Sequence, residues 1–297
     1  MNQNCLVTGA SSQIGDVLLP LLLGDGYQVT AWSRQPFRVT NKSASLMWAY
    51  VDLAEPAAIP EQVGTLLHLA SIEWLPSLLE SQQKLFPRSR PLRIIAISTC
   101  SVTAKAHSSS ERERAQAERL AKAEQQAQSL AKRDGHSLTI LRPTMLYGVG
   151  RDGTIAVMQR FAQRYHCLPI PAQSSGLRQP VHVADVAAAV ILALKSQVSI
   201  GQIYELGGAE RLSIEQLAHR VFADNQKRPY IIIVPLVFLR IGIYFMRYFK
   251  GHADWSPALL ARAKEDQLAD NTRAIADFNY APRVFDGRWP GTQGDTC

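Results

Sequence analysis

Cysteine is scarce in this chain, and the few thiols are scattered. Cys5, Cys100, Cys167 and Cys297 lie far apart in 297 residues, without a CxxC pair or a histidine at zinc-binding spacing. This excludes a disulfide framework and argues against a structural metal. The N-terminus also lacks the charged start and apolar run of a signal peptide. We therefore expect a cytoplasmic protein without a bound metal.

Charged residues are few as well, at 19% of the chain against 46% hydrophobic residues. This composition excludes a disordered or fibrous protein and supports a substantial core. The net charge of +7 favours an anionic ligand or a membrane surface, but it is too small to indicate a nucleic acid. The length suits one large domain or two interleaved ones.

Short apolar segments alternate with helical ones through the first half of the chain. Strands are predicted at 5–7, 27–32, 49–53, 65–70, 93–98 and 138–141, and a charged, alanine-rich helix over 110–133. This alternation implies right-handed crossovers and a parallel sheet. The predicted fold class is α/β, a doubly wound parallel sheet with a smaller, mostly C-terminal substrate domain. We expect residues 1–150, completed by about 178–208, to form the doubly wound domain. Residues 151–297 are expected to form a substrate or lid region that is interleaved with it.

A glycine-bearing turn follows the first strand, where residues 8–15 read TGASSQIG. A strand, such a turn and a helix start together form a cradle in which backbone N–H groups bind a pyrophosphate. The alternative is steric, because many tight turns between a strand and a helix contain glycine for conformational reasons alone.

These residues resemble the TGxxGxxG fingerprint of the extended short-chain dehydrogenase/reductase superfamily, the NAD-dependent epimerase/dehydratase group, with Ser12 at the middle glycine. Segments 51–53, 68–71, 141–148 and 178–187 resemble the same family in the same order, so the resemblance covers 5–208. It implies a nicotinamide dinucleotide site. The residues that would form this site are Gly9, Ser11, Ser12, Gln13, Ile14, Gly15, Ser33, Arg34, Asp52, Leu53, Leu69, Ala70, Ser71, Lys122 and Pro143.

The end of the second strand bears on the choice of cofactor. Sites that prefer NAD place a carboxylate there for the ribose hydroxyls, whereas this chain has Ser33 and Arg34. A hydroxyl and a cation suit a 2′-phosphate, so NADP is favoured over NAD. The alternative is that Arg34 is only a solvated residue at the strand end.

The resemblance also assigns catalytic positions. The family uses a serine or threonine and a Tyr-x-x-x-Lys motif, and Thr99 and Lys122 match the threonine and the lysine. Glu118 stands where the tyrosine belongs, and no tyrosine occurs between residues 50 and 147. Glu118 is either an acid/base group with a pKa raised by burial or a solvated residue paired with Lys122.

The resemblance further implies three substrate-binding residues, which are Ser101, Tyr147 and Arg178. His182 and Asp185 form no metal site by spacing, and Asp185 is expected to cap the helix that follows. Residues 230–249 are strongly apolar and divide at Pro235 into a strand and a helix. The helix could pack over the substrate pocket or, through 236–250, lie on a membrane surface.

Two functional hypotheses follow. The first is an NADP-dependent oxidoreductase or nucleotide-sugar epimerase/dehydratase-like enzyme with an atypical site and weak turnover, acting on a small molecule such as a nucleotide-linked sugar. The second is a non-catalytic dinucleotide-binding protein, serving as a sensor, an assembly factor or a membrane-associated accessory protein. The missing tyrosine and the apolar segment favour the second hypothesis, and Thr99, Lys122 and Arg178 favour the first.

Overall fold

A parallel sheet of seven strands forms the centre of the computed structural model, which describes residues 3–35, 44–85, 90–151, 155–172, 174–222, 230–235, 237–238 and 265–286. The strand order is β11-β6-β5-β4-β1-β2-β3, and every neighbouring pair is parallel. The strands are β1 (Asn4–Thr8), β2 (Gln28–Ser33), β3 (Leu46–Tyr50), β4 (Thr65–His68), β5 (Arg93–Ile97), β6 (Ser137–Pro143) and β11 (Ile203–Leu206). The predicted α/β fold, a doubly wound sheet, is confirmed.

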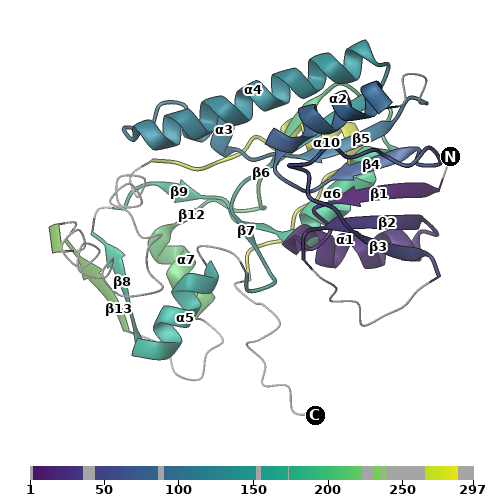
Figure 1. Cartoon of the computed structure of the whole chain (residues 1–297). Coiled ribbons are helices and arrows are strands. Elements are labelled where there is room, and N and C mark those ends of the chain that lie inside the picture. The colour runs from purple at the N-terminus through teal and green to yellow at the C-terminus, as the bar shows by residue number, and fades with distance from the viewer. Residues whose placement is uncertain are drawn as a thin grey trace.

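Helices cover both faces of the sheet (Figure 1). On one face, α1 (Gln13–Gly24) packs against α6 (Val183–Lys195) over a cluster that includes Leu18 and Val190. On the other face, α2 (Leu75–Leu85) packs against α4 (Glu111–Arg133) over a cluster that includes Leu79 and Leu120. The two layers leave the carboxyl ends of the strands uncovered by these helices, which is where α/β sheets bind ligands.

A smaller set of elements follows β6. It contains α5 (Ile155–Tyr165), α7 (Ile214–Val221) and two-stranded sheets that pair β8 (Cys167–Pro171) with β13 (Tyr230–Val234), β7 (Leu146–Tyr147) with β10 (Val181–His182), and β9 (Leu177–Arg178) with β12 (Leu212–Ser213). A separate apolar cluster holds α5, β8 and α7 together. The end of the described chain returns to the first part, where α10 (Thr272–Phe278) packs against β11 and α6.

Several local predictions are confirmed. The spacing of Ser213 and Gln216, three residues apart, predicts a capping box. The structure contains it at the start of α7, where the Ser213 side chain accepts from the backbone N–H of Gln216 and the Gln216 side chain accepts from the backbone N–H of Ser213. The long charged helix begins after Ser110 and ends at Arg133. The strand before Pro235 is β13.

Three predictions are wrong. The third strand is 46–50 and not 49–53, because the Asp52 side chain accepts from the Ala54 N–H and turns the chain after Val51. The apolar and polar pattern of 179–182 also predicts a strand, but only 181–182 form one, β10, because Pro180 has no N–H to donate. Asp185 does not cap α6: His182 does, since its Nδ1 accepts from the Ala184 N–H.

The expected helix over 236–249 lies outside the described residues, apart from residues 237 and 238. Among the helices that the structure describes, none has the length and hydropathy needed to cross a bilayer.

Candidate functional site

The strand order reverses at the carboxyl ends of β1 and β4, the place that we call the crevice below. The chain leaves β1 toward β2 on one side and leaves β4 toward β5 on the other, so the connections diverge at this point (Figure 1). Such a reversal of strand order is the usual ligand site of an open parallel sheet. Most of the dinucleotide residues expected from the sequence lie on the turns that end β1, β2, β4 and β6.

The turn after β1 depends on two glycines. Gly9 has φ +66, and a Cβ there would lie 2.5 Å from the backbone nitrogen of Ala70. A Cβ at Gly15 would lie 2.1 Å from the carbonyl oxygen of Ala10. The turns after β1 and β4 therefore pack together so closely that only glycine fits between them.

Ser12 replaces the middle glycine of the fingerprint and caps α1. Its backbone is extended, with φ −71 and ψ 165, and its hydroxyl accepts from the Gly15 N–H at 3.2 Å. The position therefore requires no glycine conformation, and the serine satisfies one of the unpaired donors at the helix start. Gln13 and Ile14 follow in the first turn, the positive end of the helix.

A pair of serines joins the end of β2 to this turn. The hydroxyl of Ser33 donates to the hydroxyl of Ser11 at 2.8 Å and accepts from the N–H of Gln35 at 3.0 Å. Ser33 is buried, whereas the next residue, Arg34, is exposed. The guanidinium of Arg34 is thus available at the position where a dinucleotide presents its adenosine ribose.

Buried hydrogen bonds hold the loop after β4. His68 Nδ1 accepts from the Thr8 hydroxyl at 2.8 Å, and His68 Nε2–H donates to the carbonyl of Ser71 at 3.0 Å. Burial lowers the pKa of His68 to about 4, so the ring is neutral. Leu69 is buried in the core beside Ala70, and Ser71 lies exposed at the crevice edge.

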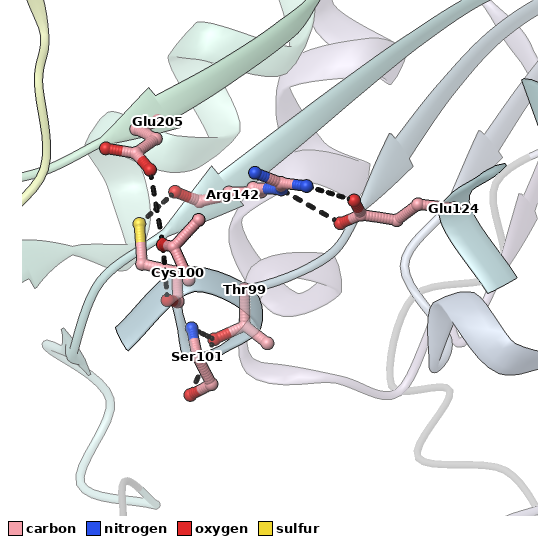
Figure 2. Close-up of polar contacts among 7 residues, drawn as sticks. Thr99, Cys100, Ser101, Glu124, Arg142 and Glu205 are labelled. Carbon is pink, nitrogen blue, oxygen red and sulfur yellow. Dashed lines mark hydrogen bonds and ion pairs between the residues drawn. The ribbon is translucent and has the colours of Figure 1, made fainter. Parts of the chain in front are cut away.

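Two hydroxyls stand at the end of β5. Thr99 Oγ1 accepts from the Ser101 N–H at 3.1 Å and donates to the Ser101 hydroxyl at 3.2 Å, so both side chains lie together at the start of α3 (Ser101–Ala104). Figure 2 shows them beside Cys100, whose thiol donates to the Arg142 carbonyl. Burial raises the pKa of Cys100 to about 12. This cysteine is therefore a packing residue and not a nucleophile, and the exposed chemistry is that of the two hydroxyls.

A buried ion pair connects β6 to α4. Arg142 donates from Nε to Glu124 Oε1 at 3.0 Å and from Nη2 to Glu124 Oε2, and the Glu124 side chain is 3% exposed (Figure 2). Pro143, the next residue, accepts from the Cys100 N–H at 3.1 Å. The pair holds this face of α4 against the sheet, and no spacing of residues along the chain indicates it.

This orientation bears on the role expected for Lys122. The face of α4 toward the sheet consists of Glu113, Ala117, Leu120, Ala123, Glu124, Ala127 and Ala131. Lys122 is exposed and lies midway between Glu113 and Ala131, about two and a half turns from each at ~3.6 residues per turn. It therefore points away from the sheet, and the structure does not bring Lys122 to the dinucleotide turns.

Glu118 is also exposed on the outer side of α4. The solvated alternative is therefore the one that the structure supports. The inward face of α4 carries neither a tyrosine nor a lysine.

Two of the three expected substrate residues are buried as packing residues. The Tyr147 ring is 1% exposed and lies edge-on to His182 and Phe285, with centroids 5.0 and 4.7 Å away. Arg178 is 8% exposed, and its Nη1 donates to the carbonyls of Leu177 and Glu265 at 2.9 and 2.7 Å. In this structure both side chains make interior contacts, so their substrate-binding roles stay predictions, whereas Ser101 lies at the crevice.

A nicotinamide dinucleotide fits the site in two respects. The N-terminal turn of α1 presents backbone donors at the carboxyl end of β1, as a pyrophosphate requires. Gln13 Oε1 is buried without a hydrogen-bond partner among the described residues. An acceptor of this kind calls for a donor, which a ribose hydroxyl supplies. The serine at position 12 pairs with the Gly15 N–H, and its hydroxyl keeps one O–H that can donate to a phosphate.

The sheet order, the glycine turn and the diverging loops define a dinucleotide-binding α/β protein. Residues 5–207 match the model of the NAD dependent epimerase/dehydratase family. The chain belongs to that family.

Solved structures with the same fold include the UDP-glucuronic acid 4-epimerase of Bacillus cereus in complex with UDP-glucuronic acid and NAD. It is 17% identical, with 96% of this chain and 95% of that chain covered and a TM-score of 0.67. The dTDP-glucose 4,6-dehydratase of Bacillus anthracis, in complex with NAD, is 15% identical, with 95% and 92% covered and a TM-score of 0.67. Identities this low show a shared fold only.

Two curated proteins match shorter stretches. The mitochondrial NADH dehydrogenase [ubiquinone] 1 alpha subcomplex subunit 9 of Arabidopsis thaliana is 34% identical over 98 residues, 33% of this chain and 24% of that protein. An uncharacterized protein of Sinorhizobium fredii is 27% identical over 153 residues, 51% of this chain and 37% of that protein. The chain thus matches well under half of the length of either relative.

Proposed function

We propose that this protein binds a nicotinamide dinucleotide but does not carry out epimerase or dehydratase chemistry by the tyrosine–lysine route. The observation that carries the proposal is the inward face of α4, which lacks the tyrosine and the lysine of the family motif. This face is formed by alanines, Leu120 and two glutamates that already have partners: Glu113 accepts from the Ser108 hydroxyl, and Glu124 is paired with Arg142. General acid/base catalysis contributes ~10²–10⁴-fold to such reactions. The Thr99 hydroxyl, a poor acid by itself, supports at most weak turnover.

The dinucleotide is NADP in this proposal. Arg34 is exposed at the end of β2, and the neighbouring residues Ser33 and Gln35 bring no carboxylate to repel a 2′-phosphate. NAD is the cofactor named for the solved neighbours, which makes the preference of this chain a distinguishing property. A charge-assisted contact to the 2′-phosphate adds about 1.5–3 kcal/mol, or roughly 10- to 150-fold in affinity.

An accessory or sensing role is consistent with this site. The match to a subunit of a mitochondrial NADH dehydrogenase, although it covers a quarter of that protein, supports such a role over a metabolic one. The burial of Tyr147 and Arg178 is in line with such a role, since neither side chain is exposed at the surface.

Fluorescence titration with NADPH and NADH tests the cofactor part. We expect the wild type to bind NADPH at least about tenfold more tightly than NADH, and Arg34→Ala to abolish the difference without weakening NADH. Arg160→Ala removes an exposed arginine from α5, which packs against β8 and α7, and serves as the control for net charge. Equal affinities of the wild type for the two dinucleotides would contradict the NADP preference.

Turnover measurements test the catalytic part. Wild-type protein with bound dinucleotide is incubated with UDP-glucose or UDP-glucuronic acid, and the products are separated by chromatography. We expect little or no conversion. Rapid conversion, at rates typical of enzymes (~1–10³ s⁻¹), would refute the proposal.

A further inference from the structure

Arg151, which none of the segments that carry the family resemblance includes, lies beside the turn that ends β1. After β7, the chain turns at Gly148 and Gly150, which have φ +123 and +69. A Cβ at Gly148 would lie 2.4 Å from Nε2 of His182, so a side chain there would disrupt the path. These two glycines bring Arg151 from the β6–β7 side of the sheet to the start of α1.

Arg151 contacts residues on both sides of Ser12, the N-cap of α1. Its Nη1 donates to the carbonyl of Ser11 at 3.3 Å, and its Nη2 pairs with the carboxylate of Asp16. Its side chain is 36% exposed. A guanidinium has five N–H donors in a planar fork, and these contacts use two of the five within the described part of the chain. Because the side chain is partly exposed, it is accessible to a ligand beside the turn.

An anion can bind at the start of α1 only if the negative charge of Asp16 is compensated, and Arg151 supplies that positive charge. Asp16 is in the first turn of α1, where its negative charge opposes a phosphate approaching the same helix end. Ser12 further removes the Gly15 N–H from the available donors. Arg151 neutralises the carboxylate and adds donors of the kind that bind phosphate bidentately.

From this placement we infer that Arg151 binds the pyrophosphate of the dinucleotide and supplies charged donors beside a turn in which the Gly15 N–H is already paired with Ser12. The inference rests on the proposed function, since it assigns a residue to the same site. It differs from the role of Arg34 because the pyrophosphate is common to NAD and NADP. Arg151 therefore sets the affinity for both dinucleotides, and Arg34 sets the difference between them.

The test is a set of titrations with NADPH, NADH, ADP and adenosine on the full chain. We expect Arg151→Ala to weaken NADPH, NADH and ADP each by about tenfold or more, and to leave adenosine, which has no phosphate, unchanged. Arg151→Lys, which keeps the charge but loses the fork, is expected to lie between the two proteins. Arg160→Ala should match the wild type.

The outcomes separate this inference from the proposed function. If the wild type binds dinucleotides and Arg151→Ala binds all four ligands as well as the wild type does, the inference is refuted and the proposed function stands. An equal loss for ADP and adenosine also refutes it, because the arginine then only holds the turn in shape. If the wild type binds no dinucleotide, the proposed function itself fails. Thermal melting of each variant verifies folding, since an exposed ion pair contributes little to stability.

Discussion

Breaking the Arg142–Glu124 pair tests the orientation of α4, on which the assignment of the site depends. Both carboxylate oxygens of Glu124 accept from Arg142, and the two side chains are 3% and 15% exposed. Removing one partner of a buried pair costs about 3–5 kcal/mol, because the other charge stays buried without compensation. Glu124→Gln keeps one acceptor oxygen, so we expect the lower end, about 3 kcal/mol.

Urea unfolding provides the measurement, with the midpoint and slope fitted for each protein. Lys122→Ala, two residues away on the same helix, is the matched control. Because Lys122 is exposed opposite the buried face, we expect a change within about 0.5 kcal/mol and unaltered dinucleotide binding. The double variant Arg142→Met/Glu124→Met should recover much of the loss, since apolar side chains leave no buried charge.

The opposite pattern would refute the assignment. If Lys122→Ala weakens dinucleotide binding about tenfold, or if Glu124→Gln is as stable as the wild type, then α4 meets the sheet with another face. Glu118→Gln adds a second control on the outer side of the helix, and we expect both its stability and its ligand binding to match the wild type.

Three further predictions concern the turns and the interior. Gly9→Ala should lower the free energy of unfolding by at least ~1 kcal/mol and weaken dinucleotide binding, because φ is +66 and the new Cβ would meet the nitrogen of Ala70 at 2.5 Å; a fully stable variant with normal binding would contradict this. The pKa of His68 is lowered by burial from 6.5 to about 4, so its neutral form stabilises the fold above pH 6.5, and roughly 3 kcal/mol is lost as the pH falls from 6.5 to about 4. Urea unfolding at intervals between these pH values, compared with His68→Gln, isolates this contribution, and parallel curves for the two proteins would argue against it. Arg178→Ala should destabilise the chain, because the lost guanidinium leaves the carbonyl of Glu265 without that donor, and a variant of full stability with impaired nucleotide-sugar binding would instead support the substrate-binding role of Arg178.

The sequence by itself determined the order of elements and the local turns. Alternating apolar segments identified most strands of the sheet, although the third was displaced by three residues at its start because Asp52 turns the chain. The glycine turn and the Ser213–Gln216 capping box were readable because their geometry depends on neighbours a few residues apart. Turns and helix caps of this kind can be predicted from the sequence because the residues that form them are close together along the chain.

Tertiary structure decided which side chains face the site. Helix α4 carries alanines on several sides, so its sequence does not define a unique buried face, and its orientation follows from the pairing of Glu124 with Arg142 on a distant strand. In the same way, Arg178 donates to the carbonyl of Glu265 in the interior. Arg151 reaches the start of α1 because the chain crosses to it from β7. Each of these contacts joins residues far apart along the chain, and an ion pair or hydrogen bond depends on distance in space, which spacing along the sequence does not record.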